Sequence, residues 1–470
     1  MRAAHDGGAT SPRNLTAQPH PATSPRPVGG QERHVGIGDY NISASSSLGG
    51  RVRYGHDQDT PASGTHPLMT APQVTHRVSI VIGTRPEAIK MAPVVRAIHE
   101  HPHLEPLVIA TTQHREMLKQ ALDVFGIVPH IDLGLMQNGQ NLGVFTSRAL
   151  AALTDCFLDV KPDFLLVQGD TSTVTAACLA GFYQGVPIGH IEAGLRSFDL
   201  SSPFPEEVNR RIATCTANVH FAPTTEARNN LISEGIPEGD IFVTGNTVVD
   251  ALQMVPPRAT FETASLNDLP WDTHRVLLTT VHRRESLGEH LDAICDALES
   301  IVRLHDDVVI AFPVHLNPRV RDVVFRRLGD VPRIFLLDPL PYPELLEIIR
   351  RCFFVLSDSG GIQEEVPSFR KPIFVLRDTT ERPEVLRSGF GELVGTDAAR
   401  ILSRASALLT DPEAYLSRTS GVNPFGDGRA GFRIAEVIDT LLRHPRERSG
   451  PRRLDHQEVN ATLERLSRAG

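Results

Sequence analysis

The chain has 470 residues, of which 40% are hydrophobic, enough to build the cores of two or three domains. Its formal net charge of -9 argues against a general nucleic-acid-binding protein, and no apolar run is long enough to cross a bilayer. The five cysteines form no CxxC pair and have no disulfide-like spacing, which favours a reducing compartment, so we expect a cytoplasmic protein.

The two ends of the chain differ in composition from its middle. Residues 1–75 are rich in Pro, Gly, Ser, Thr and His and lack helix or strand periodicity, so we expect a disordered N-terminal tail. Residues 445–470 are expected to form a charged C-terminal tail.

Between these tails, short apolar strands alternate with amphipathic helices. The strands expected in the first half are Val78–Ile82, Leu107–Ala110, Phe164–Gln168, Ile188–Ile191, Val219–Ala222 and Ile241–Val243. The helices expected among them include Ile89–Glu100, Ser172–Gln184 and Thr225–Glu234. After a polar, Pro-containing stretch around residues 256–271, the strands expected are Val276–Thr280, Val308–Phe312, Ile334–Leu337, Phe353–Leu356 and Ile373–Leu376.

Continuous apolar strands linked by helices indicate parallel sheets that are covered on both faces. Because the alternation restarts, we predict an α/β protein with two Rossmann-like, doubly wound domains, residues 76–256 and 257–444, facing a cleft. The last helix is a candidate to pack back on the first domain. In such sheets ligands bind beyond the carboxyl ends of the strands, so the residues at those ends are candidates for the functional site.

The first strand runs into a turn that carries Arg85 and Lys90. Two solvated cations at an ordinary strand-to-helix turn are one interpretation, and a clamp for an anionic substrate is the other. Later strands deliver carboxylates. Asp170 is either a helix cap or a carboxylate that faces the cleft. Glu192 either forms a salt bridge with Arg196 or is a catalytic carboxylate. Glu206 opens a predicted helix. Together the three carboxylates form a candidate acid/base set.

The second half repeats this pattern with cations and histidines. His282 and Arg283 follow the first strand of this half, and His315 follows the second. Histidines and an arginine at consecutive strand ends fit a binding site for a polyanion. The Ser359-Gly360-Gly361 turn lets backbone N–H groups approach a diphosphate, and Glu365 is placed to bond ribose hydroxyls. An ordinary glycine-containing turn is the alternative for this segment. Arg382 adds a cation after a further strand.

Several cofactor signatures are missing from the sequence. Gly389-Phe390-Gly391 leads to Gly395, one residue too far for a GxGxxG fingerprint, and no Walker-type GK[ST] occurs. The histidines lack metal-ligand spacing. We therefore predict no bound dinucleotide, ATP or metal.

Nine strings in order resemble the non-hydrolysing UDP-N-acetylglucosamine 2-epimerases over about residues 78–442: GTRPEAIKMAP, QHREML, HIEAGLR, PFPEE, FVTGNT, HRRES, PVHLNP, SDSGGIQEE and RDTTERPE. The resemblance implies a fold like that of the GT-B glycosyltransferases, a homodimer and no cofactor. The sequence departs from the usual family pattern beside the proposed groups, at Gln168, Phe204 and Val281, which bears on substrate detail more than on reaction class.

The resemblance also implies roles for individual residues. Catalysis would fall to Asp170, Glu192, Glu206 and His282. Binding of the UDP part would fall to Arg85, Lys90, Ser359, Gly360, Gly361, Glu365 and Arg382. An adjoining site for activation by UDP-N-acetylglucosamine would use Gln113, His114, Glu116, Arg148, Arg283 and His315.

The expected reaction is the interconversion of UDP-N-acetylglucosamine and UDP-N-acetylmannosamine. The C2 hydrogen is not next to a carbonyl, and without a dinucleotide fingerprint prior oxidation is disfavoured, so we expect elimination of UDP to a glycal and its re-addition. A GT-B glycosyltransferase, a hydrolysing epimerase and a non-catalytic UDP-sugar sensor are the alternatives.

Overall fold

The computed structural model describes residues 75–443, apart from 113–114 and 138. All of these residues belong to one compact unit that begins at Thr70. The predictions for the N-terminal and C-terminal tails, and for Gln113 and His114, lie outside the described residues.

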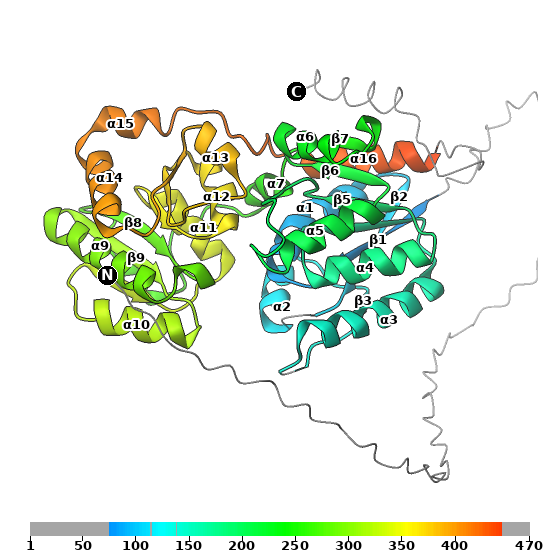
Figure 1. The fold of residues 1–470 in the computed structure, drawn as a ribbon, viewed down its shortest axis with the longest axis horizontal. Coiled ribbons are helices and arrows are strands. Elements are labelled where there is room, and N and C mark those ends of the chain that lie inside the picture. The colour runs from blue at the N-terminus through cyan, green and yellow to red at the C-terminus, as the bar shows by residue number, and fades with distance from the viewer. Residues whose placement is uncertain (1–74, 113–114, 138, 444–470) are drawn as a thin grey trace, which may run out of the picture. The chain divides into compact units, whose positions relative to one another are not determined.

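The first half is built on a seven-stranded parallel sheet with the order β3-β2-β1-β4-β5-β6-β7 (Figure 1). Its strands are β1 His76–Ile82, β2 Leu104–Ala110, β3 Ile131–Asp132, β4 Phe164–Gln168, β5 Ile188–Ile191, β6 Val219–Ala222 and β7 Ile241–Val243. The order reverses between β1 and β4, so the turns after these two strands flank a switch point where ligands bind in doubly wound sheets.

Helices cover both faces of this sheet. Its helices are α1 Arg85–Glu100, α2 Arg115–Val124, α3 Leu142–Val160, α4 Ser172–Tyr183, α5 Glu206–Thr216, α6 Thr225–Ser233 and α7 Thr247–Met254. Helix α4 contacts α3 and α5, and α1 contacts α2 and α7.

The second half has a six-stranded parallel sheet with the order β10-β9-β8-β11-β12-β13. Its strands are β8 Arg275–Thr280, β9 Val308–Pro313, β10 Ile334–Leu337, β11 Val355–Ser357, β12 Ile373–Val375 and β13 Gly391–Leu393. The helices of this half, with α8 before it, are α8 Ala264–Asn267, α9 Glu289–Leu304, α10 Pro318–Leu328, α11 Tyr342–Arg351, α12 Gly360–Glu365, α13 Pro383–Arg387, α14 Ala398–Thr410 and α15 Pro412–Ser417.

The last described helix, α16 Ala430–Arg443, packs on the first half against α1 and α7 (Figure 1). Its start is held by the backbone N–H of Gly431, which donates to Asp250 at 2.8 Å. A Cβ on Gly431 would lie 2.8 Å from the carbonyl oxygen of Pro93 in α1, so a glycine is needed for this close approach. The helix thus supplies part of the core of a half from which it is distant in sequence.

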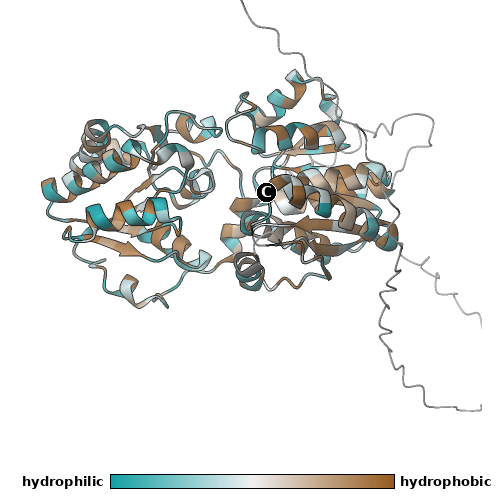
Figure 2. Ribbon diagram, turned by 60° about the horizontal axis from the view of Figure 1, so that its bottom comes forward, coloured by the Kyte–Doolittle hydropathy of each residue, from teal (hydrophilic) through white to brown (hydrophobic). Residues whose placement is uncertain are grey.

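The strands of both sheets are the most hydrophobic parts of the fold, and the outer sides of the helices are mixed or polar (Figure 2). The central strands are buried along their length, as in β4, where all five residues are buried. Among the described residues, no helix is long and apolar enough to span a membrane.

The structure confirms the predicted fold class of two parallel sheets with alternating helices. Two short strands were not predicted. Strand β3 has only two residues, and β13 begins at Gly391, so neither offers the apolar run by which strands are recognised.

Candidate active site

The turn between β1 and α1 carries the first predicted anion-binding residues, Arg85 and Lys90. The helix begins at Arg85 because Glu87 accepts the backbone N–H of Thr84 at 2.8 Å, which satisfies one of the donors left over at a helix start. The guanidinium carbon of Arg85 lies 5.9 Å from the centre of the Tyr342 ring, which belongs to the second half. Burial lowers the pKa of Arg85 despite the nearby negative charge of Glu365.

Glu192 follows β5 and lies where the two halves meet. Its carboxylate accepts a hydrogen bond from Gln168 at 2.8 Å and pairs with the ammonium of Lys90. The same ammonium is 2.7 Å from Glu364, and Arg382 lies 2.7 Å from Glu364 and 3.8 Å from Glu192. Burial raises the pKa of Glu192, with the charge of Lys90 opposing it, so Glu192 holds a proton more readily than an exposed glutamate. Such a group suits proton transfer.

A salt bridge between Glu192 and Arg196, one of the alternatives from the sequence, is wrong. Arg196 instead contacts Glu234 and Thr214, each at 2.7 Å. The backbone of Glu192 has a φ of 64°, a left-handed conformation that is costly for a residue with a side chain. This tight turn separates the two side chains, with Glu192 contacting Lys90 and Arg196 contacting the end of α6.

Asp170 does not cap α4, so that interpretation is also wrong. The cap is Thr171, whose hydroxyl accepts the backbone N–H of Val174 at 3.3 Å. The Asp170 carboxylate lies 2.6 Å from Arg210, and its backbone carbonyl accepts a hydrogen bond from Asn209 at 2.8 Å. Helix α5 therefore holds the Asp170 turn.

Helix α5 begins at Glu206, where the sequence predicts a helix to open. The next residue, Glu207, is fully buried and accepts hydrogen bonds from Ser197 at 3.1 Å and Arg210 at 3.0 Å. Glu206 has a buried carboxylate oxygen with no hydrogen-bond partner in the described part of the chain. Because Glu206 precedes Arg210 by one helical turn, it lies on the face of α5 that contacts Asp170.

The carboxylates of Asp170 and Glu192 each lie beside an arginine, and these two arginines are near one another. Arg210, the partner of Asp170, is close enough to Arg382 that the charge of Arg382 lowers the pKa of Arg210, although the net shift is upward. Arg382 in turn contacts Glu192. The structure thus brings Asp170 and Glu192 to neighbouring positions along one edge of the first sheet.

His282 follows β8, and its Nδ1 lies 3.0 Å from the carboxylate of Asp358, which follows β11. The ring of His315, after β9, is 6.0 Å from the ring of His282. Burial lowers the pKa of His315, and the charge of His282 adds to that effect. The two histidines expected at consecutive strand ends are therefore neighbours.

The Ser359–Gly361 turn opens helix α12, with the Ser359 hydroxyl as its cap. A Cβ on Gly360 would lie 2.8 Å from a guanidinium nitrogen of Arg382, so a larger residue at this position would displace that guanidinium from the turn. Glu365 accepts a hydrogen bond from the Tyr342 hydroxyl at 3.1 Å, and burial raises its pKa to about 7. Its role toward a ribose stays a prediction.

Sequence reasoning selected Arg382 but missed the carboxylates that pair with it, Glu364 and Glu381. Arg382 contacts Glu364 at 2.7 Å and Glu381 at 2.6 Å, and Glu381 contacts Arg377 at 2.9 Å. Burial opposes ionisation of Glu364, yet Arg382 and Lys90 hold its pKa below the usual value. The signals that could have found these carboxylates are the adjacent glutamates in SDSGGIQEE and the glutamate beside Arg382 in RDTTERPE.

The residues expected at an adjoining activator site are only partly described. Glu116 lies in α2, but its side chain is outside the description. Arg148 donates to Gln140 at 3.3 Å, and Arg283 lies 3.7 Å from Glu381. Arg283 and His315 are thus placed beside the cluster around Arg382 and His282, whereas Arg148 lies in α3 and contacts Gln140.

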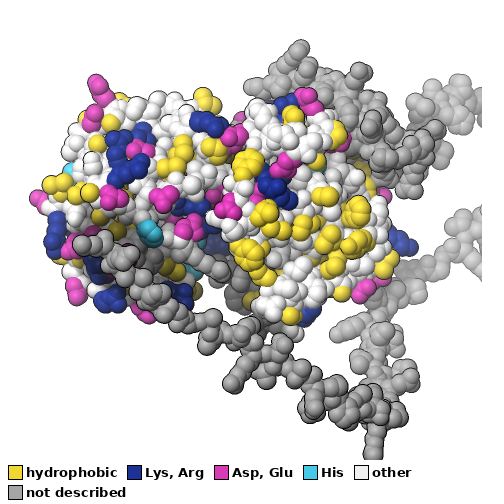
Figure 3. Space-filling model, in the orientation of Figure 1, with side chains coloured by type: hydrophobic (Ala, Val, Ile, Leu, Met, Phe, Trp, Pro, Cys, Tyr) yellow, Lys and Arg dark blue, Asp and Glu magenta, His cyan; other side chains and the backbone are white. Residues whose placement is uncertain are grey.

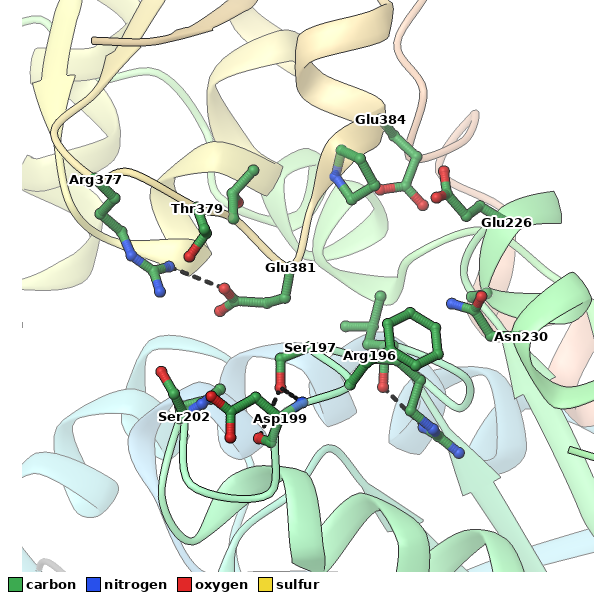
Figure 4. A pocket seen from close by; sticks show the side chains of 16 residues that line it. Arg196, Ser197, Asp199, Ser202, Glu226, Asn230, Arg377, Thr379, Glu381 and Glu384 are labelled. Carbon is green, nitrogen blue, oxygen red and sulfur yellow. Dashed lines mark hydrogen bonds and ion pairs between the residues drawn. The ribbon is translucent and has the colours of Figure 1, made fainter. Parts of the chain in front are cut away.

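A cavity of about 330 Å³ lies between Leu195–Pro203 and α6 on one side and Arg377–Glu384 on the other (Figure 4). Glu381 points toward Arg377 in its wall, while Glu384 and Glu226 lie at the opposite end (Figure 4). None of the predicted catalytic residues lines this cavity. Arg377 and Glu381, two members of the charged cluster around Arg382, line the cavity, and Glu381 also contacts Arg382.

Comparisons with known proteins agree with this arrangement. The family model of UDP-N-acetylglucosamine 2-epimerase matches residues 96–439. The chain belongs to the UDP-N-acetylglucosamine 2-epimerase family. A member from Salmonella typhimurium is 47% identical over 368 residues, which cover 77% of this chain and 98% of that protein.

Solved structures of epimerase family members share the fold. The enzyme from Neisseria meningitidis, bound to UDP-GlcNAc, is 42% identical, with a TM-score of 0.73 over 78% of this chain and 100% of that chain. The enzyme from Methanocaldococcus jannaschii, in complex with UDP-GlcNAc and UDP, is 32% identical, with a TM-score of 0.68 over 77% of this chain and 99% of that chain.

Proposed function

We propose that this chain interconverts UDP-N-acetylglucosamine and UDP-N-acetylmannosamine without hydrolysing them. Family membership supports the substrate. The observation that carries the proposal is the buried cluster of Glu192, Lys90, Glu364 and Arg382, in which an acid/base group of the first half meets cations and a carboxylate of the second.

The reaction needs a proton to leave C2 while the bond between C1 and the diphosphate oxygen breaks. A carboxylate takes the proton, the C1–O electron pair leaves with UDP, and a 2-acetamidoglucal remains. A proton then returns to the other face of C2, and the UDP oxygen forms a new bond to C1. Asp170, Glu192 and Glu206 are the groups for these transfers, since two faces of one carbon require groups on both sides.

Charge builds up on the departing diphosphate, and fixed cations lower the barrier to its departure. Arg85, Lys90 and Arg382 supply positive charge, and the Ser359–Gly361 turn supplies backbone N–H groups. Lys90 and Arg382 are already paired with carboxylates, so these groups are held in place before a ligand arrives.

One assay separates this proposal from its alternatives. Full-length protein is incubated with UDP-N-acetylglucosamine in heavy water and followed by proton NMR. The epimerase incorporates deuterium at C2 and yields UDP-N-acetylmannosamine. A glycosyltransferase leaves C2 unlabelled, a hydrolysing enzyme accumulates free N-acetylmannosamine, and a sensor binds without turnover. Conversion without label at C2 would refute the proposal.

We also propose that the protein works as a homodimer. Apolar side chains gather on one face of the first half, in the region of α3, α4 and α5 (Figure 3). On α4, Phe182 and Tyr183 are 58% and 65% exposed, and on α3 Leu158 is 52% exposed. Exposed apolar patches of this kind mark protein interfaces. Light scattering of Phe182→Asp, compared with wild type, tests this, and an unchanged dimer or a monomeric wild type would contradict it.

We further propose that UDP-N-acetylglucosamine binds a second site that includes Arg283 and His315, beside His282. This assignment predicts that low concentrations of the sugar nucleotide accelerate conversion of UDP-N-acetylmannosamine, and that His315→Ala removes the acceleration. Equal acceleration in the variant would exclude His315 from that site.

A further inference from the structure

The carboxylate of Asp358 is fully buried and receives hydrogen bonds from the segment that carries His282. Its oxygens accept the backbone N–H of His282 at 2.9 Å and that of Arg283 at 2.8 Å. They also accept the hydroxyl of Ser286 at 2.9 Å, and the imidazole Nδ1 of His282 lies 3.0 Å away. One side chain therefore organises the whole turn after β8.

The groups that surround this carboxylate are hydrogen-bond donors, so they favour its ionised form. Burial acts to raise the pKa of Asp358, but the hydrogen bond and charge of His282, with the backbone N–H groups of Arg283 and His282, hold it below the usual value. A protonated Asp358 would direct a hydrogen at one of these donors. Asp358 is therefore a fixed negative charge.

An ionised carboxylate determines which nitrogen of His282 carries the proton. A neutral imidazole has one N–H and one lone pair, and a lone pair on Nδ1 would face a carboxylate oxygen at 3.0 Å. Only the tautomer with hydrogen on Nδ1 turns this contact into a hydrogen bond. Nε2 then carries the lone pair, and it has no hydrogen-bond partner in the part of the protein that the structure describes.

We propose that Asp358 is a positioning residue for His282: it holds the proton on Nδ1 and fixes the ring, so that Nε2 is the nitrogen presented to the substrate. This inference rests on the proposed function and on the catalytic role that the family resemblance implies for His282. The side chain of His282 is 37% exposed, which leaves Nε2 accessible to a ligand.

The arrangement suits the step in which UDP departs. When His282 is protonated, Nε2–H donates a hydrogen bond to an oxygen of the departing diphosphate, and Asp358 balances the charge of the imidazolium ring. No proton passes to Asp358, and the C1–O electron pair leaves with UDP. Because Asp358 directly precedes Ser359, the same carboxylate also ties the His282 turn to the predicted diphosphate turn.

The tautomer can be measured without any substitution. Full-length protein carrying ¹⁵N-histidine is examined by NMR at pH 8, and the His282 signals are assigned by their loss in His282→Gln. We expect a protonated Nδ1 and an unprotonated Nε2 in the wild-type protein. A hydrogen on Nε2 instead of Nδ1 would overturn the proposal, whatever the variants do.

Kinetics of Asp358→Asn test whether the carboxylate acts through the ring. The amide carries no charge to balance the imidazolium ring, and it can place an N–H toward Nδ1 that keeps the ring neutral. The departing diphosphate then loses its charged donor, and loss of such acid assistance costs on the order of 10²- to 10⁴-fold in kcat. We expect a loss of this kind with KM changed less than about threefold. Asp306→Asn is the matched control, because the Asp306 side chain is 99% exposed and its carboxylate lies 3.6 Å from Arg333.

A double substitution separates positioning from general damage. If Asp358 acts through His282, adding Asp358→Asn to His282→Gln lowers kcat no further. Additive losses, or an Asp358→Asn variant with wild-type kcat, would refute the role. If Asp358→Asn does not fold, the wild-type tautomer alone decides. A wild-type protein that shows the expected tautomer but no turnover of UDP-N-acetylglucosamine refutes the proposed function and leaves the Asp358–His282 assignment standing.

Discussion

Replacement of Lys90 by methionine is the sharpest test of the buried charge cluster. The Lys90 ammonium pairs with Glu192 and lies 2.7 Å from Glu364, and the lysine side chain is only 8% exposed. Methionine keeps most of the side-chain volume and removes the charge. Two buried carboxylates then share Arg382 as their remaining cation.

The cost follows from the burial of these groups. Removing one partner of a buried ion pair destabilises a protein by about 3–5 kcal/mol, and since Arg382 still contacts Glu364 we expect about 3 kcal/mol. With an unfolding entropy of about 2.1 cal/mol/K per residue over roughly 370 residues, this lowers Tm by about 4 °C. Lys119→Met is the matched control, because Lys119 forms an exposed pair with Asp123, and such pairs contribute less than about 1 kcal/mol.

The loss of stability in Lys90→Met should also depend on pH. Burial already raises the pKa of Glu192, and removing Lys90 raises it further. A carboxyl group whose pKa in the folded state exceeds the unfolded value of about 4.3 destabilises the fold above its raised pKa, and this penalty shrinks as pH falls toward about 4.3. Calorimetry of Lys90→Met and Lys119→Met between pH 5 and 8 measures both effects. Equal Tm values, or a deficit that grows on acidification, would refute this reasoning.

Three further predictions concern single side chains. Glu192→Gln should lower kcat on the order of 10³-fold while UDP binding, measured by calorimetry, changes little; retained C2 exchange would contradict this. Glu206→Gln should lower kcat without changing Tm, because one of its carboxylate oxygens has no hydrogen-bond partner among the described residues. Glu207→Gln should instead lower stability by about 2 kcal/mol, because Glu207 accepts buried hydrogen bonds. The reverse pattern would exchange the roles of the two residues. Burial lowers the pKa of His220 to about 3, so on acidification the unfolded chain binds this proton before the folded protein does. Stability therefore falls as pH drops below about 6.5, the usual pKa of histidine. His220→Asn should flatten this fall by about 1.4 kcal/mol per pH unit, and an unchanged slope would contradict the reasoning.

The sequence predicted the strands and turns well because their signals are local. Strands β4 to β7 match their predicted bounds, since each is a short, mostly apolar run ended by Gly, Pro or polar residues. Helix α5 begins at Glu206 for an equally local reason, an acidic first turn after two prolines.

Pairing between distant residues was not predictable in this way. Glu192 and Arg196 are four residues apart and suggest a salt bridge, yet the left-handed turn at Glu192 separates them. Contacts of Glu364 with Lys90 and of Asp358 with His282 join residues that are far apart in the chain. Only the packing of the two halves and the order of the strands bring them together.

The return of α16 to the first half has a consequence for how the protein is made. Helix α16 covers α1 and α7, and the backbone N–H of Asn246 donates to the carbonyl of Phe425 at 2.8 Å just before the helix. Domains usually fold in the order in which they leave the ribosome. Here the first half to emerge keeps an uncovered apolar face until the final helix has been synthesised, so its folding is completed only after that of the second half can begin.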